Sequence, residues 1–315
     1  MTTPATTPRI KAKQRLGDRI FSSTALTAGT LILAVLAAVA AFLLVESVPA
    51  LTEDPEEIDI LAGQPFWAYV APLVFGTIWS AALALLMAVP VSIGIALFIS
   101  HYAPRKLAAG LGYIIDLLAA VPSVVFGLWG ANVLAPAVQP FYSWLTENLG
   151  WIPLFAPPAS GTGRTILTAA IVLAVMVLPI ITALTREVFL QTPVLHEEAA
   201  LALGATRWEM IRTAVLPFGR PGIISASMLG LGRALGETMA VAMVLSASGG
   251  ITFALLTSSN PGTIAANIAL RFPEAFGLNT NLLIATGLIL FAITLVVNMI
   301  ARWIIGRRKE FSGAN

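Results

Sequence analysis

Long apolar runs dominate this chain and constrain its fold more than any other feature. A helix needs about 20 apolar residues to cross the roughly 30 Å hydrocarbon core of a bilayer. Six runs approach or exceed that length: Thr24–Val45, Leu73–Ile99, Leu111–Leu128, Ile166–Leu184, Ile223–Leu245 and Leu282–Ile305. Backbone polar groups in lipid must find hydrogen bonds within the protein, and the alternating strands of a membrane barrel are not seen. We therefore predict an all-α, polytopic membrane protein with six transmembrane helices.

The composition agrees with a membrane location and excludes several kinds of site. Of the 315 residues, 57% are hydrophobic and 11% are charged, whereas about 25% of the residues in a soluble domain are charged. The chain has no cysteine, which excludes disulfides and thiolate metal sites. Its two histidines, His101 and His196, are far apart in sequence, and no Walker A pattern is found. We therefore predict no metal site and no ATP bound by this chain itself.

The charged residues predict the orientation, because loops rich in lysine and arginine stay in the cytoplasm. With six spans, the basic clusters of the N-terminal tail, the turn after the second run, the loop after the fourth run and the C-terminal end all share one side. The other side has Arg164, Arg271 and an acidic loop over residues 46–59. Both termini are therefore predicted to be cytoplasmic. Orientation alone explains these clusters better than nucleic-acid binding does.

We predict a short flexible cytoplasmic tail over residues 1–15 and a single transmembrane domain over residues 16–315. A signal peptide is the alternative for the first run, but that run is longer than the usual apolar region of about 7–15 residues. The external loop over residues 131–163 is rich in proline, glycine and aromatics, and either rests at the membrane interface or contacts an external partner. A second external loop contains Ile264–Leu270, which is too short to span and fits a re-entrant or surface helix.

A cytoplasmic loop over about residues 186–221 contains the start and stop signals of a short helix. Thr192 can cap its beginning, with Pro193 at the favoured first position. Gly204 can end it in a left-handed conformation. These residues predict that the first half of the loop is helical.

A second short helix is predicted directly after the first. Thr206 and Glu209 have the spacing of a capping box, which starts a helix. Pro217 and Pro221 are predicted to stop that helix and to start the next span. The loop should therefore form a helix–turn–helix on the cytoplasmic face.

The fifth apolar run contains charges that are costly in a membrane. Arg233 and Glu237 are four residues apart, so on one continuous helix they share a face. They fit either a substrate pathway or an internal salt bridge that stabilises the bundle, and we favour the pathway. Gly232 and Gly236 form a GxxxG pattern that predicts helix packing. Asp116, near the cytoplasmic end of the third run, is another candidate pathway residue, with interfacial solvation as the alternative.

The motifs together resemble one family of transporters. Glu198-Ala199-Ala200, Gly204 and Leu216-Pro217 have the spacing of the EAA loop of bacterial ABC-importer permeases, although Ala214 stands where that family often has isoleucine. The fifth-run sequence G-L-G-R-A-L-G-E-T-M-A-V resembles the PstC-type permeases of phosphate ABC importers more closely. L-L-A-A-V-P-S-V-V-F-G-L-W-G and V-F-L-Q-T-P-V, earlier in the chain, extend the resemblance, which runs from about residue 17 to about residue 305.

This resemblance implies a type I ABC permease fold in the bacterial plasma (inner) membrane and inward transport of inorganic phosphate. It implies a sister permease of the PstA type, a dimer of PstB-type ATPases that holds ATP and Mg, and an external PstS-type phosphate-binding protein. The EAA loop would dock on the ATPase, and the chain itself would have no catalytic residue and no cofactor. Arg233 and Glu237 match family positions implicated in phosphate movement, and Asp116 resembles a glutamate often found there.

Three other functions are weighed against this one. The nearest is a permease for another oxyanion, such as sulfate or molybdate, which the fifth-run motif disfavours. A proton-coupled secondary transporter that uses Asp116 or Glu237 would not need the cytoplasmic helix–turn–helix. A membrane signalling subunit without transport would not need paired charges deep in a span.

Overall fold

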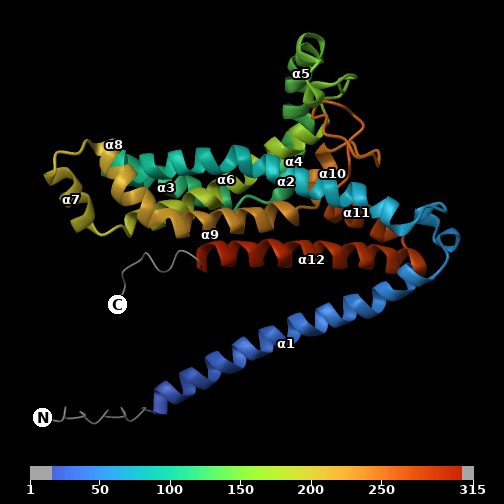
Figure 1. The fold of residues 1–315 in the computed structure, drawn as a ribbon, viewed down its shortest axis with the longest axis horizontal. Coiled ribbons are helices and arrows are strands. Elements are labelled where there is room, and N and C mark those ends of the chain that lie inside the picture. Colours follow the sequence, from blue (N-terminus) through green and yellow to red (C-terminus); the bar gives the residue numbers. More distant parts are fainter. Residues whose placement is uncertain (1–15, 307–315) are drawn as a thin grey trace, which may run out of the picture.

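The computed structural model describes residues 16–306, which form a bundle of long helices with smaller helices at both ends (Figure 1). The α-helices are α1 (Leu16–Thr52), α2 (Phe66–Leu97), α3 (Arg105–Ala119), α4 (Ser123–Trp129), α5 (Ala135–Leu149), α6 (Ile166–Leu190), α7 (Val194–Ala202), α8 (Arg207–Met210), α9 (Leu216–Leu235), α10 (Met239–Val244), α11 (Ile264–Arg271) and α12 (Leu278–Gly306). Regular structure in these residues is helical, apart from an isolated bridge between Ala247 and Asn260. The predicted tail over residues 1–15 lies outside the described residues.

The prediction of six membrane-crossing helices is confirmed in number for residues 16–306. The helices that are long and apolar enough to cross are Leu16–Thr52, Phe66–Tyr102, Ser123–Leu149, Ile166–Leu190, Arg207–Leu235 and Leu278–Ile304. Four of them overlap the predicted runs closely, whereas the third is displaced towards the C-terminus and the fifth towards the N-terminus. The chain is therefore a multi-pass membrane protein.

The centre of the bundle is the contact between α2 and α6. Ala81, Ala84 and Ala88 of α2 are fully or almost fully buried and pack in one cluster with Leu173 and Val177 of α6. Lipid tails are as apolar as these side chains, so close van der Waals packing of small residues is what holds such helices together. An apolar stripe of small residues on α2 thus explains why α6 is the most deeply buried of the long helices.

Helix α9 packs against α6 through glycines. A Cβ atom at Gly222 would lie 2.4 Å from Val188, and one at Gly230 would lie 2.7 Å from Ile181. A side chain at either position would have to displace Val188 or Ile181. Glycine therefore sets the distance between α9 and the bundle centre.

Two of the predicted spans, the third and the fifth, are interrupted. The prediction that each is one continuous helix is wrong. The third run contains a break over residues 120–122 between α3 and α4, because Pro122 has no amide hydrogen and disfavours helical backbone at the residue before it. The fifth run breaks over residues 236–238 between α9 and α10. Both breaks lie within apolar sequence.

The segment over residues 131–163, predicted as a loop, is largely helical. Helix α5 occupies residues 135–149 and projects away from the direction of the long helices (Figure 1). The short apolar piece at Ile264–Leu270 is confirmed as a helix, α11, which packs against α2, α10 and α12. Helices α7 and α8 lie at the opposite end of the bundle from α11 (Figure 1).

Candidate functional site

The predicted charged motif lies where α9 ends and α10 begins. The Gly236 amide donates to the Gly232 carbonyl at 3.3 Å, which closes the last turn of α9, and α10 starts at Met239. Non-helical backbone at membrane depth is tolerated where it is buried in protein or lines a water-filled cavity. The break at this motif is therefore expected to be buried in protein or to line a water-filled cavity.

Glu237 lies in this break and caps the N-terminus of α10. Its side chain is buried, with 8% of the residue exposed, and its Oε1 accepts a hydrogen bond from the Ala240 amide at 3.0 Å. A carboxylate at a helix N-terminus is stabilised by the free amides and by the helix dipole. Glu237 thus has a partner in the backbone of α10.

Arg233 is exposed on the last turn of α9 and has no carboxylate partner within residues 16–306. The expectation that Arg233 and Glu237 share one helix face is wrong, because the helix ends at Leu235 and Glu237 turns to the Ala240 amide. A guanidinium without a carboxylate keeps its planar set of donors available for an oxyanion.

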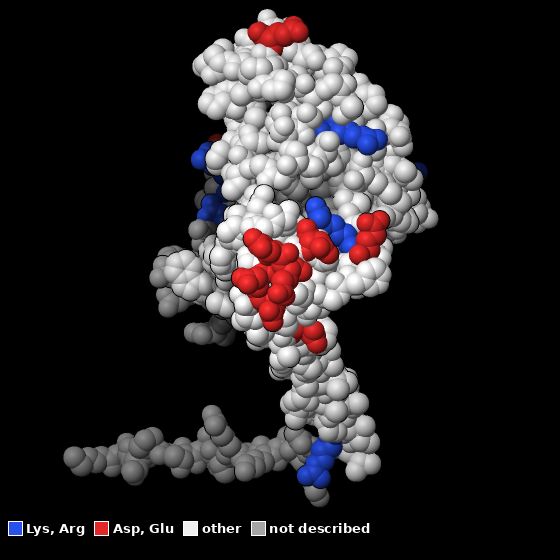
Figure 2. Space-filling model, turned by 90° about the vertical axis from the view of Figure 1, so that its right-hand side faces the viewer, with Lys and Arg blue, Asp and Glu red and all other residues white. Residues whose placement is uncertain are grey.

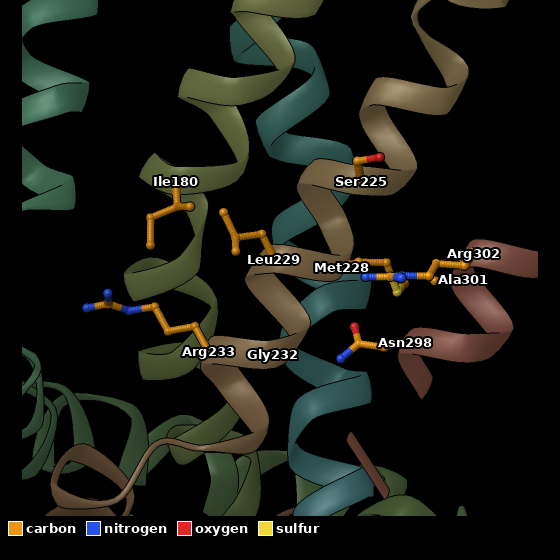
Figure 3. Close-up of a pocket in the computed structure, with 9 residues that line it drawn as sticks. All are labelled: Ile180, Ser225, Met228, Leu229, Gly232, Arg233, Asn298, Ala301 and Arg302. Atoms are coloured by element: carbon orange, nitrogen blue, oxygen red, sulfur yellow. The ribbon is translucent and has the colours of Figure 1, made fainter. Parts of the chain in front are cut away.

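A cavity of about 590 Å³ adjoins this arginine. Its lining comes from α6, α9 and α12 and comprises Ile180, Ser225, Met228, Leu229, Gly232, Arg233, Asn298, Ala301 and Arg302 (Figure 3). In this view Arg302 reaches from α12 towards Met228, whereas Arg233 extends on the other side of α9. Both arginines line this cavity, Arg233 from α9 and Arg302 from α12, although their side chains extend in different directions in this view.

The packing predicted for Gly232 and Gly236 is not seen within the described chain. Both residues are exposed, and a Cβ atom at Gly232 would meet nothing within 4 Å. The glycines that pack α9 against α6 are instead Gly222 and Gly230. A GxxxG pair does not say which neighbour it faces, and packing at Gly232 and Gly236 against another chain stays a prediction.

Asp116 is exposed on α3, outside the helices that are long enough to cross a membrane. Its helix packs against α6, where the Arg186 side chain lies over Gly112: a Cβ atom at Gly112 would be 2.1 Å from Arg186 Nη1. Asp116 is one turn further along α3. Asp116 is not among the residues that line the cavity at Arg233.

The loop that was predicted to be cytoplasmic forms the predicted helix–turn–helix, consisting of α7 and α8. Gly204 ends the first helix with φ +86°, a left-handed conformation that favours glycine. Its amide donates to Leu201 O at 2.9 Å, and the Ala205 amide donates to Ala200 O at 3.2 Å. The tight turn predicted at Gly204 is confirmed.

The capping box predicted for the second helix is also confirmed. Thr206 Oγ1 accepts from the Glu209 amide at 3.3 Å, and Glu209 Oε2 accepts from the Thr206 amide at 2.7 Å. The cap predicted for Thr192 is wrong: the helix begins after Pro193, and Thr192 completes the end of α6 through a 3.2 Å bond from its amide to Phe189 O.

The prolines predicted to end the second helix do not end it. Helical backbone continues from Arg207 to Leu235, with a π-helical segment over Ile211–Val215 just before Leu216-Pro217. The Leu216 amide donates to Ile211 O, five residues back. This wider turn absorbs the amide missing at Pro217, and π segments often mark functional sites.

The residues of the EAA pattern divide into packed and exposed positions. Ala200 and Leu216 pack against the cluster of Leu97, Phe189 and Ile211, which joins α7 to the ends of α2 and α6. Glu198, Ala199 and Gly204 are exposed. One side of the pattern therefore fixes α7 to the bundle and the other side is available for a partner.

Sequence reasoning missed four apolar side chains that surround the exposed part of this pattern. Val194, Leu195, Leu203 and Trp208 are all exposed, and Leu203 is 90% exposed. It also missed the contact between His101 Nε2 and Glu197 Oε1, at 3.4 Å, which ties α7 to the end of α2. The sequence does contain a signal for the exposed apolar side chains, because apolar residues at the ends of short helices are unusual in a loop that is otherwise charged.

A bundle of membrane-length helices with a protruding helix–turn–helix at one end is typical of a membrane permease. The chain belongs to the family of binding-protein-dependent transport system inner membrane components, which matches residues 88–310.

The chain is 44% identical to phosphate transport system permease protein PstC 2 of Mycobacterium tuberculosis, over 97% of this chain and 98% of that protein. It is 40% identical to phosphate transport system permease protein PstC of Mesorhizobium japonicum, over 95% of this chain and 93% of that protein. The fold is shared with a bacterial ABC transporter involved in the import of the acidic polysaccharide alginate, with a TM-score of 0.61, 19% identity and coverage of 92% and 97% of the two chains. The chain thus has the type I ABC permease fold.

Proposed function

We propose that this chain is the permease subunit through which an ABC importer moves inorganic phosphate into the bacterial cytoplasm. The relatives named as phosphate permeases support the substrate. The observation in the molecule that carries the proposal is Arg233, an exposed guanidinium beside a cavity, without a carboxylate partner in the described chain. Such a group can donate two hydrogen bonds to one phosphate ion.

Glu237 has a different role from the one the sequence suggested. Glu237 binds the N-terminus of α10 at the break and does not bind Arg233. The carboxylate thereby fixes the backbone next to the arginine and keeps a negative charge near the path, which favours release of an anion over tight retention. We keep Arg233 as the contact to phosphate and Glu237 as a positioning residue, and assign Asp116 no contact with the ion.

The exposed side of α7 and α8 supports docking of a separate ATPase. Leu195, Leu203 and Trp208 are exposed on α7, on α8 and on the turn between them, and these two helices lie at one end of the bundle (Figure 1). Exposed apolar patches of this kind mark protein interfaces. We infer that a dimer of PstB-type ATPases binds here and carries the ATP and Mg of the transport cycle.

The remaining partners follow from the proposed cycle. An external PstS-type protein delivers phosphate, and a PstA-type sister permease covers the open faces of α9 and α12. The end that carries α7 and α8 faces the cytoplasm together with both termini, in the plasma membrane. ATP binding closes the ATPases, moves α7 and, through the cluster at Ile211, tilts α9.

Uptake of labelled phosphate by the reconstituted complex tests this function. We expect Arg233→Gln to leave the complex assembled and to reduce uptake at least about tenfold, since a charge-assisted hydrogen bond is worth about 1.5–3 kcal/mol. Arg233→Lys should retain part of the activity. The control is Arg19→Gln, an exposed arginine on α1.

The same assay separates the rival functions. Sulfate or molybdate that competes equally with phosphate would favour the permease for another oxyanion. Uptake that persists without ATP and follows a proton gradient would favour a secondary transporter. Full uptake by Arg233→Gln would overturn the proposed role of this arginine.

A further inference from the structure

A second cavity, of about 520 Å³, lies at the end of the bundle opposite α7. It is bordered by α2, α10 and α11 and by the loop segments near residues 62 and 248. The cavity at Arg233 is lined by α6, α9 and α12, so the two share no lining residue. This end also carries the loop that the charge pattern assigned to the outside.

The walls of this second cavity are fixed by close backbone contacts. A Cβ atom at Gly76 would lie 2.1 Å from the Gly262 carbonyl oxygen, so α2 and the loop before α11 touch directly. Thr77 Oγ1 accepts a hydrogen bond from the Ile264 amide at 2.9 Å, and Thr263 caps the start of α11. The cavity is therefore built into the fold rather than left between loose loops.

Three polar side chains meet in the cavity. Asn267 Nδ2 donates to the Tyr69 hydroxyl at 2.8 Å, and the Arg271 guanidinium lies 5.9 Å from the centre of the Tyr69 ring. Because the tyrosine oxygen accepts from Asn267, its own proton remains for a ligand. Arg271 has no carboxylate within 4.0 Å in the described part of the chain. These groups offer a cation and a hydroxyl donor to the same space.

The cavity also adjoins the candidate pathway. Val241 and Ala242 form part of its lining, and both belong to α10, the helix that Glu237 caps. We propose that this cavity is an external receiving site for a phosphoryl oxyanion, bound by Arg271 and the Tyr69 hydroxyl before the ion passes α10 towards Arg233. This inference rests on the proposed function.

The surrounding negative charge lowers the affinity of this site for an anion, as a site of transient binding requires. Acidic side chains gather at this end of the molecule, with few basic groups among them (Figure 2). Two of these acids, Glu46 and Asp59, accept hydrogen bonds from Asn281 and Asn279 of α12 and are thus held by that helix. Arg271 attracts an anion, whereas the surrounding carboxylates repel it, so the anion is held weakly. Weak binding permits transfer to the next site.

Protection of an introduced thiol tests the receiving site without requiring transport. Ser248→Cys places a reactive group on the cavity lining of a chain that has no other cysteine. In the detergent-purified complex without the external binding protein or added lipid, inorganic phosphate should slow modification of this chain by N-ethylmaleimide. Adding Arg271→Gln should raise the phosphate concentration needed at least about tenfold, because a charged hydrogen bond is lost.

Two further variants keep the result independent of misfolding. Tyr69→Phe retains the ring beneath Arg271 and should raise the required phosphate concentration by a smaller factor. Arg164→Gln is the matched control, because it removes the other arginine predicted on this side, which lines a different hollow. It should leave protection by phosphate unchanged.

The outcomes separate this inference from the proposed function. Protection by free phosphate that is lost with Arg271→Gln supports the receiving site. No protection, equal loss with Arg164→Gln, or protection only when phosphatidylglycerol is added would overturn it, the last by assigning the cavity to a lipid headgroup. A complex that takes up phosphate in an Arg233-dependent manner yet shows no protection would leave the proposed function intact.

Discussion

At the scale of single residues, the most consequential finding is that Glu237 binds backbone. Its Oε1 accepts from the Ala240 amide at 3.0 Å, while Arg233 lies exposed on the preceding helix. We expect Glu237→Ala to destabilise the assembled complex by about 1 kcal/mol, the usual cost of losing a helix cap. Glu237→Gln should keep most of that stability, since its amide oxygen can still accept. Unfolding of the purified complex in SDS measures the difference.

The control for this prediction is Glu274→Ala, which removes an exposed carboxylate at the end opposite α7. The swapped pair, Arg233→Glu with Glu237→Arg, is a sharper test. A structural salt bridge would be restored by the swap, whereas a cap and a separate phosphate contact are both lost. Recovery of stability and uptake in the swapped variant would refute the geometry described here.

At the scale of elements, the turn between α7 and α8 sets the orientation of these two helices relative to each other. Gly204 has φ +86° and open space around it, so a substitution there meets backbone strain rather than a steric clash. We expect Gly204→Val to cost about 1–2 kcal/mol locally and to reduce ATPase binding and uptake, with Gly204→Asn the mildest replacement. Copurification of the ATPase, with uptake measured beside it, checks this order.

The matched control is Gly277→Val, because Gly277 also has a positive φ, +55°, with open space around it, but lies next to α12 at the far end. It should leave ATPase binding unchanged. If both valine variants lose the ATPase equally, the effect is general misfolding and the coupling role of the turn is refuted.

Local signals predicted this turn well and the interrupted spans poorly. Gly204, Thr206 and Glu209 act through bonds to residues a few positions away, so their pattern is visible in sequence. The breaks at Pro122 and Gly236 were hidden because hydropathy sums side-chain transfer energies and ignores backbone hydrogen bonding. Once a helix ends, the four-residue spacing that placed Arg233 and Glu237 on one face no longer applies.

The tertiary contacts could not be predicted from spacing alone. Nothing in the GxxxG pattern distinguishes the exposed Gly232 from Gly230, which packs against Ile181. The receiving cavity likewise depends on Thr77 meeting Ile264, residues far apart in the chain. Charge counting identified Arg164 and Arg271 as the basic residues of the side predicted to be outside, but it did not indicate that Arg271 lines a cavity.

At the scale of the whole molecule, charge and shape agree on one orientation. The described ends of α1 and α12 lie at the same end of the bundle as α7 (Figure 1). Acidic side chains gather at the opposite end (Figure 2). Helix α1 diverges from α12 and exposes apolar residues along its length, as a helix facing lipid does. The molecule therefore has α7 and α8 at one end, and acidic side chains and the second cavity at the other.

Labelling of single cysteines in intact cells tests this orientation, since the natural chain has none. Glu57→Cys and Trp151→Cys place thiols at exposed positions of the segments predicted outside, and Trp208→Cys places one on α8. We expect an impermeant maleimide to modify the first two in intact cells and the third after permeabilisation, because basic loops remain in the cytoplasm. A permeant maleimide controls for reactivity at each position. Modification at position 208 in intact cells would reverse the orientation and place the coupling helices away from any ATPase.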